Sequence, residues 1–308
     1  MNELNAPKVQ KYTSQIIIFL TALRIRQWIK NFIVLLPLVF VLDQQWSYSE
    51  KTSLLITTLQ AIGAFTIFCL LSSGTYLIND LFDLKYDQRH PKKQYRPIAS
   101  GALSPSYAKF AATVLIILGL TLSSILNNNF LIIAITYVII TIAYSKIFKH
   151  IAWVDIIILI SGYLLRAMAG ASALEAPISI WLYVIVGLSA TLIGLIKRKS
   201  EIENTLLFSS RQVLNKYNPI LLKRLIYLIS ILTITSYSLY TLLAKSLPSN
   251  NTMTITIPIA GYCLFRYLKI ANGHHIGESP EEILWKDRAI KIGIFLWLIS
   301  TICILYFQ

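Results

Sequence analysis

The chain has 308 residues, of which 56% are hydrophobic and 14% are charged. Soluble globular domains carry about 25% charged residues, so this composition excludes an ordinary soluble domain, a disordered chain and a secreted disulfide scaffold. The formal net charge is +14, but the basic residues lie in gaps between apolar stretches and form no continuous basic region. The sequence therefore predicts a membrane protein with no nucleic-acid partner.

Nine apolar segments reach or approach the roughly 20 residues that a helix needs to cross the bilayer. The first is short for a span unless its helix begins among residues 24–30. The predicted spans are residues 29–43, 54–78, 106–126, 130–148, 151–174, 179–197, 221–244, 252–271 and 289–307. We therefore expect an all-α polytopic membrane protein with nine transmembrane helices. We expect residues 1–308 to form one transmembrane domain, with residues 1–14 as a flexible cytoplasmic tail. The stretch from Met1 to Ala22 lacks the small-residue cleavage site expected of a signal peptide.

The Lys and Arg residues indicate the orientation of these spans, because cytoplasmic loops carry an excess of positive charge. Alternate gaps, at residues 1–30, 79–109, 146–149, 197–224 and 266–291, hold 25 of the 28 basic residues. The intervening gaps hold only Lys51 and Lys245. We therefore place the N-terminus and the basic loops in the cytoplasm and the C-terminus outside. The composition suggests a bacterial inner membrane.

The second predicted span ends in a run of acidic residues. Residues 54–78 contain no charged side chain, and Asp80, Asp83 and Asp87 follow directly after Asn79. Spacings of three and four place these carboxylates on one face of a helix, where they repel one another. Mg²⁺ prefers oxygen ligands and is often shared between carboxylates and substrate phosphates. The run therefore predicts a Mg²⁺ site, and the alternative is a solvated acidic helix end.

Basic residues follow this acidic run on the same side of the membrane. The stretch from His90 to Gly101 contains Lys93 and Arg96. Metal-binding carboxylates beside a Lys and an Arg suit a pyrophosphate leaving group, whose developing charge the cations take up. His90 either donates to a phosphate or is a turn residue next to Pro91.

Further polar groups are expected at the same end of the bundle. Lys30 precedes the first span, and Asp155 lies one turn into the fifth, where an ionisable residue indicates function. The groups that close the fourth and sixth spans are Tyr144 with Lys149, and Lys197 with Arg198. Each basic group alone also fits ordinary positive-inside topology.

Arg166 is the basic residue inside an apolar segment. It lies about 16 Å deeper than Asp155 if residues 155–166 are helical. A buried cation needs a partner. Two interpretations remain open: a structural ion pair with Glu175 or a carbonyl cap, and a side chain that lines the substrate site.

The pattern Asn79-Asp80-x-x-Asp83-x-x-x-Asp87 at the end of a second span resembles the UbiA superfamily of intramembrane transferases. Within it, the chain most resembles the decaprenyl-phosphate phosphoribosyltransferase branch, from about residue 20 to the C-terminus. The motifs that carry this resemblance are Gln27-Trp28-Ile29-Lys30-Asn31, His90-Pro91 with Arg96-Pro97-Ile98-Ala99-Ser100-Gly101, Tyr144-Ser145 with Lys149 and Asp155, Leu165-Arg166-Ala167 with Ala169-Gly170, Lys197-Arg198 with Glu201, and Pro280-Glu281-Glu282 with Asp287.

The sequence departs from the superfamily pattern at two positions. Ile25 stands where the family often has Pro. Leu159 stands where prenyltransferases usually complete a second Asp-rich motif after Asp155. The second departure weakens a prenyl-diphosphate interpretation and agrees with the phosphoribosyl branch.

The resemblance implies Mg²⁺-dependent transfer of a 5-phosphoribosyl group from phosphoribosyl pyrophosphate to a polyprenyl phosphate, with release of pyrophosphate. The expected partners are these two substrates, the membrane and a second copy of the chain in a homo-oligomer. The candidate catalytic residues are Lys30, Asp80, Asp83, Asp87 and Arg96, with the three aspartates as metal ligands. The candidate substrate-binding residues are Asn79, His90, Lys93, Tyr144, Lys149, Asp155, Arg166, Lys197 and Arg198.

Two rival functions remain open at this stage. An aromatic prenyltransferase of the same superfamily would move a prenyl group from its diphosphate to an acceptor such as 4-hydroxybenzoate. A lipid or phosphate transporter would be expected to have a polar site at the membrane midplane, whereas most ionisable groups here lie in the predicted cytoplasmic gaps.

Overall fold

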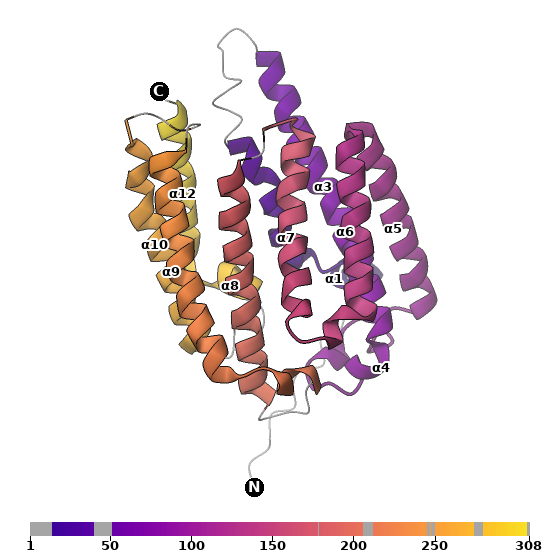
Figure 1. The fold of residues 1–308 in the computed structure, drawn as a ribbon. Coiled ribbons are helices and arrows are strands. Elements are labelled where there is room, and N and C mark those ends of the chain that lie inside the picture. Colours follow the sequence, from indigo (N-terminus) through magenta and orange to yellow (C-terminus); the bar gives the residue numbers. More distant parts are fainter. Residues whose placement is uncertain are drawn as a thin grey trace.

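The computed structural model describes residues 14–39, 51–177, 179–205, 212–244, 247, 250–273 and 280–306, and all regular structure within them is helical. The long helices run side by side as a bundle (Figure 1). The elements are α1 Gln15–Ala22, η1 Ile25–Leu35, α3 Lys51–Phe82, α4 Leu84–Asp87, η2 Lys93–Tyr95, α5 Pro105–Leu126, α6 Asn128–Lys146, η3 Phe148–His150, α7 Val154–Ala173, α8 Ile180–Thr205, η4 Gln212–Lys216, α9 Pro219–Leu243, η5 Thr252–Ile255, α10 Thr256–Gly273, α11 Pro280–Lys286 and α12 Arg288–Tyr306.

Seven helices in the described ranges are long and apolar enough to cross a membrane: α3, α5, α6, α7, α8, α9 and α12. They coincide with seven of the nine predicted spans, so the all-α membrane fold is confirmed. The predicted span at 252–271 falls largely on α10, which is not among the seven. The predicted span at 29–43 falls on η1, on the helical residues 36–39 and on residues outside the described ranges. The count of nine stays a prediction, and of the predicted tail only Ser14 is described.

Several helix starts follow directly from capping residues. The Asn127 side chain accepts a hydrogen bond from the backbone N–H of Phe130, 2.8 Å away, and so begins α6. Ser104 and Asn218 cap α5 and α9 in the same way, each followed by a proline in the first turn. Such side chains satisfy N–H groups that lack a partner within the helix. Asn127 thus separates α5 from α6, in the gap between the predicted spans 106–126 and 130–148.

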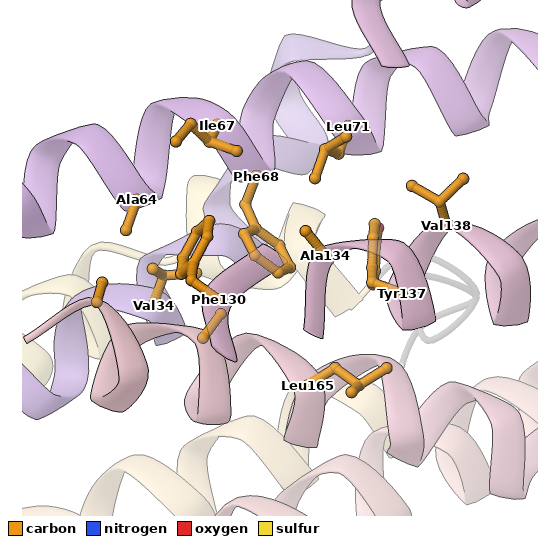
Figure 2. Packing of buried hydrophobic residues seen from close by; sticks show 12 residues of the cluster. Val34, Ala64, Ile67, Phe68, Leu71, Phe130, Ala134, Tyr137, Val138 and Leu165 are labelled. Carbon is orange, nitrogen blue, oxygen red and sulfur yellow. The ribbon is translucent and has the colours of Figure 1, made fainter. Parts of the chain in front are cut away.

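The largest buried cluster lies between α3, α6, α7 and η1. Figure 2 shows Phe68 of α3 beside Phe130 and Tyr137 of α6, and the ring centroids of Phe68 and Phe130 are 5.8 Å apart. Burying such aromatic and aliphatic side chains is the main favourable contribution to this packing. The cluster ties η1 to the bundle through Val34, which is fully buried.

η1 is an unusually long 3-10 helix of 11 residues. Its three-residue period places Asn31 and Val34, both 0% exposed, on the row that begins with Trp28. This row faces α3 and α7. A Cβ added to Gly170 of α7 would lie 2.0 Å from the Val34 carbonyl oxygen, so glycine is required at this position for the two backbones to touch.

Candidate functional site

The acidic run lies at the end of α3, at the bottom of the bundle in Figure 1. Arg96 Nη1 lies 3.1 Å from Asp80 Oδ1 and 2.6 Å from Asp87 Oδ2, so one guanidinium bridges two carboxylates. Asp83 lies between α3 and α4 with φ −89° and ψ 2°, and its carboxylate accepts a hydrogen bond from Lys149 instead. The local break in the helix therefore separates Asp83 from the other two aspartates.

Arg24 also reaches this cluster, although no sequence motif identified it as a site residue. Its side chain pairs with Asp80, and its guanidinium lies 5.3 Å from the centroid of the Tyr76 ring. The backbone of Arg24 has φ 54°, a left-handed conformation that costs free energy for a residue other than glycine. The sequence feature that could have indicated this role is the position of Arg24 at the start of the basic stretch that contains Lys30.

Burial shapes the electrostatics of this acidic cluster. It raises the pKa of Asp87, although the nearby Arg96 works in the opposite direction. Burial and the neighbouring Arg24 lower the pKa of Arg96. Asp87 Oδ1 is buried with no hydrogen-bond partner among the described residues, and such an oxygen is costly unless a ligand satisfies it.

These residues fit a divalent cation that is shared with substrate phosphates. In the described ranges, no three His, Cys, Asp or Glu side chains lie close enough to hold a metal by themselves. Asp80 and Asp87 nevertheless share one guanidinium, and Asp87 contributes the unsatisfied oxygen. Mg²⁺ commonly takes one or two carboxylates and completes its shell with water and phosphate oxygens.

The basic loop after α4 folds over this cluster. Lys93 Nζ lies 5.5 Å from the centroid of the Tyr86 ring. The Nδ1 atom of His90 accepts hydrogen bonds from the backbone N–H groups of Lys92 and Lys93, at 3.2 and 3.3 Å. His90 therefore orders the turn that presents Lys93. Asn79 is half-buried and immediately precedes Asp80.

A second charged cluster joins α7, α8 and the segment before α9. Arg198 Nε lies 2.7 Å from Asp155 Oδ2, and the two side chains are 1% and 0% exposed. Arg198 also pairs with Glu201, and its Nη2 donates to the Tyr144 hydroxyl at 3.4 Å. Asp155 is thus neutralised inside the protein. Lys197 precedes Arg198 and is half-buried.

Tyr217 completes the second cluster and was missed in the sequence. Its hydroxyl donates to Asp155 and accepts from the backbone N–H of Trp153 at 2.9 Å. Burial and the hydrogen bond to Asp155 raise the pKa of Tyr217. Trp153 has φ 70° and its ring centroid lies 5.0 Å from that of Tyr217. No motif marks a tyrosine that reaches across 62 residues of sequence.

Lys30 belongs to η1, and Arg166 of α7 contacts η1 through Asn31. Lys30 donates to Gln27, three residues earlier on the same 3-10 row. Arg166 is 5% exposed and donates to Asn31 Oδ1, Gly162 O and Tyr137 Oη at 2.7, 2.8 and 2.8 Å. The carbonyl cap expected for Arg166 is therefore present. The alternative pairing with Glu175 is wrong, because Glu175 lies exposed beyond the far end of α7.

Comparisons with known proteins agree with this architecture. The UbiA prenyltransferase family matches residues 34–275. The chain is 31% identical to a decaprenyl-phosphate phosphoribosyltransferase of Mycolicibacterium smegmatis, over 93% of this chain and 92% of that protein. It is 29% identical to the protein of the same name from Mycobacterium tuberculosis, over 91% of each. The solved structure of a UbiA homolog from Archaeoglobus fulgidus bound to GPP and Mg²⁺ superposes with a TM-score of 0.68 at 19% identity, covering 94% of this chain and 99% of that one.

Proposed function

Because the chain belongs to the UbiA prenyltransferase family, we propose that this membrane transferase moves a 5-phosphoribosyl group from phosphoribosyl pyrophosphate to a polyprenyl phosphate. Its relatives over more than nine-tenths of the chain are named as decaprenyl-phosphate phosphoribosyltransferases. The reactive end of the bundle faces the cytoplasm of a bacterial inner membrane, as the distribution of Lys and Arg predicts.

The observation that carries this proposal is the contrast between the acidic cluster and the buried Asp155. Asp155 already pairs with Arg198, and position 159, one turn further along α7, is the apolar Leu159, which packs in a hydrophobic cluster. A second carboxylate pair for a metal is therefore lacking in this part of α7. The donor carries a pyrophosphate and a 5-phosphate and the acceptor a third phosphate, which suits a site richer in cations than in carboxylates.

The acidic cluster and the basic residues around it have distinct roles in this proposal. Asp80 and Asp87 would hold Mg²⁺, which when bound offsets the charge of the diphosphate, and Asp83 would join them once Lys149, its present partner, binds a phosphate. Arg24, Arg96 and Lys149 donate hydrogen bonds to phosphate oxygens once the carboxylates that now accept those bonds are otherwise engaged. Lys30, Lys93 and Lys197 extend the positive charge around the site.

The reaction needs no general base. A polyprenyl phosphate is already an anion at neutral pH, and one of its oxygens attacks C1 of the ribose. The bond between C1 and the diphosphate oxygen breaks, and the electron pair leaves with the diphosphate. Stabilising that leaving group is the main task of the surrounding cations.

The test is a comparison of substrate pairs with purified protein in lipid nanodiscs. We expect pyrophosphate release and a phosphoribosylated lipid from phosphoribosyl pyrophosphate with polyprenyl phosphate, and loss of both on chelation of Mg²⁺. Pyrophosphate release only from geranyl diphosphate with 4-hydroxybenzoate would favour an aromatic prenyltransferase. Movement of lipid across the bilayer without product would favour a transporter.

A further inference from the structure

Arg166 differs from the other buried cations of the described helices in the charge of its partners. Lys149 and Arg198 each lie against a carboxylate. Arg166 donates to an amide oxygen, a backbone carbonyl and a phenol, all neutral, and no carboxylate in the described part of the chain pairs with it. A buried cation without an opposite charge is costly in a membrane protein, so this position suits an anionic ligand.

The guanidinium also has donors and space for such a ligand. An arginine side chain carries five N–H groups, and three nitrogen atoms of Arg166 each donate one hydrogen bond to the neutral acceptors. A Cβ added to Gly162, one turn earlier on α7, would meet Arg166 Nη1 at 3.4 Å and no other atom within 4 Å apart from its own helix backbone. The glycine therefore leaves room beside the guanidinium.

The depth of Arg166 relates it to the acidic cluster. Its partner Asn31 donates to Ser72 Oγ of α3 at 3.1 Å. Ser72 precedes Asp80 by eight residues, which is about 12 Å along an α-helix. Arg166 thus lies about two turns further into the bundle than the carboxylates that would hold the donor diphosphate. In a displacement at C1, the attacking oxygen approaches from the side opposite to the leaving diphosphate, and this side is the membrane interior.

We propose that Arg166 binds the phosphate of the polyprenyl phosphate acceptor and so selects a phosphorylated lipid over a neutral acceptor. The proposal rests on the proposed function and specifies its second substrate site. The hydrogen bonds to Asn31 and Tyr137 hold the guanidinium in place, and Gly162 leaves the space that a phosphate oxygen needs.

The test compares R166K with R166M, which are similar in size and differ in charge, in the nanodisc assay. We expect R166M to raise the KM for polyprenyl phosphate at least 30-fold, about 2 kcal/mol, with the KM for phosphoribosyl pyrophosphate within 3-fold of the wild type. R166K should keep most of the acceptor affinity. Equal losses in both variants, or equal changes in both KM values, would show a structural role and overturn the proposal.

A second variant leaves Arg166 unchanged. G162A fills the space beside the guanidinium and should raise the acceptor KM about 3-fold or more, whereas G187A, whose added Cβ would meet only Leu164 at 3.8 Å, should not. An unchanged acceptor KM in G162A would contradict the proposal even if R166M does not fold. If the wild type transfers no phosphoribose, the proposed function fails first and is distinguished from a failure at Arg166.

Discussion

The two charged clusters, one around Asp80 and Asp87 and the other around Asp155, contain similar residues in different environments. In the acidic cluster of Asp80 and Asp87, the bridging Arg96 side chain is 28% exposed. In the second cluster, Asp155 and Arg198 are 0% and 1% exposed and pair directly. We propose that the first cluster exchanges its partners with a ligand, whereas the second mainly holds helices in place. The exposure of the arginine therefore distinguishes the two clusters better than residue type does.

The largest expected effect is the loss of enzymatic activity when an aspartate of the acidic cluster is substituted. D80N removes one negative charge at nearly constant size and should lower turnover at least about 100-fold, because the leaving group loses metal-assisted stabilisation. The thermal midpoint should change little, since Arg24 and Arg96 remain partly exposed. The measurement is pyrophosphate release across a Mg²⁺ titration, with circular dichroism melts as the control. Mg²⁺-dependent turnover at the wild-type rate would disprove the metal assignment.

Substitutions in the second cluster should mainly lower the free energy of unfolding. R198M leaves the Asp155 carboxylate buried without its cation, which costs about 3–5 kcal/mol in free energy of unfolding. Combining it with D155N should recover part of this loss, because the double variant no longer buries a charged carboxylate at position 155, and only the more exposed Glu201 loses the Arg198 cation. Reversible unfolding in detergent measures both effects. A stable R198M with unchanged melting would mean that Asp155 is not held by this pair.

The contact between η1 and α7 should give an intermediate effect. G170A places a methyl group against the Val34 carbonyl oxygen and should lower the free energy of unfolding by about 1–3 kcal/mol. Turnover should fall as well, because η1 carries Lys30. The matched control is G63A in α3, where an added Cβ meets nothing within 4 Å and alanine should be neutral or slightly stabilising. Equal behaviour of the two variants would contradict the close backbone contact.

The smallest effect is expected at a charge pair away from both clusters. Arg266 Nη2 lies 2.8 Å from Asp287 Oδ2, and this hydrogen bond lowers the pKa of Asp287 in the folded protein. A lowered pKa stabilises the fold above the unfolded-state pKa, and this contribution is lost as the pH falls through the folded-state pKa. D287N should therefore melt slightly below the wild type at pH 7, with the difference closing below about pH 4. A difference in melting temperature that widens at acidic pH would contradict a lowered pKa of Asp287 in the folded protein.

Much of the fold was predictable because hydrophobic length is a strong signal in a membrane protein. The gap between the predicted spans 106–126 and 130–148 and the charge-free run before Asn79 located helix ends closely. The 3-10 conformation of η1 was not predictable, because a short apolar segment does not reveal whether its period is 3.0 or 3.6 residues. The separation of Asp83 from Asp80 was missed for a related reason: spacing rules assume an unbroken helix.

The charged residues of the site were predictable by type but not by partner. Asp80, Arg96, Lys149 and Arg198 were all identified in the sequence, and the structure places them at one end of the bundle. Their pairing depends on tertiary contacts between segments far apart in the chain. Tyr217 shows the limit most clearly, because its role depends on the position of Asp155 and on the backbone of Trp153.

The 3-10 geometry of η1 changes the length that a short segment covers. At about 2.0 Å per residue, its 11 residues cover about 22 Å, whereas an α-helix of the same length covers about 16 Å. An α-helix would need about four more residues to cover the same depth. A stretch that looks too short to traverse the hydrocarbon layer when counted in α-helical turns thus gains reach from its tighter winding.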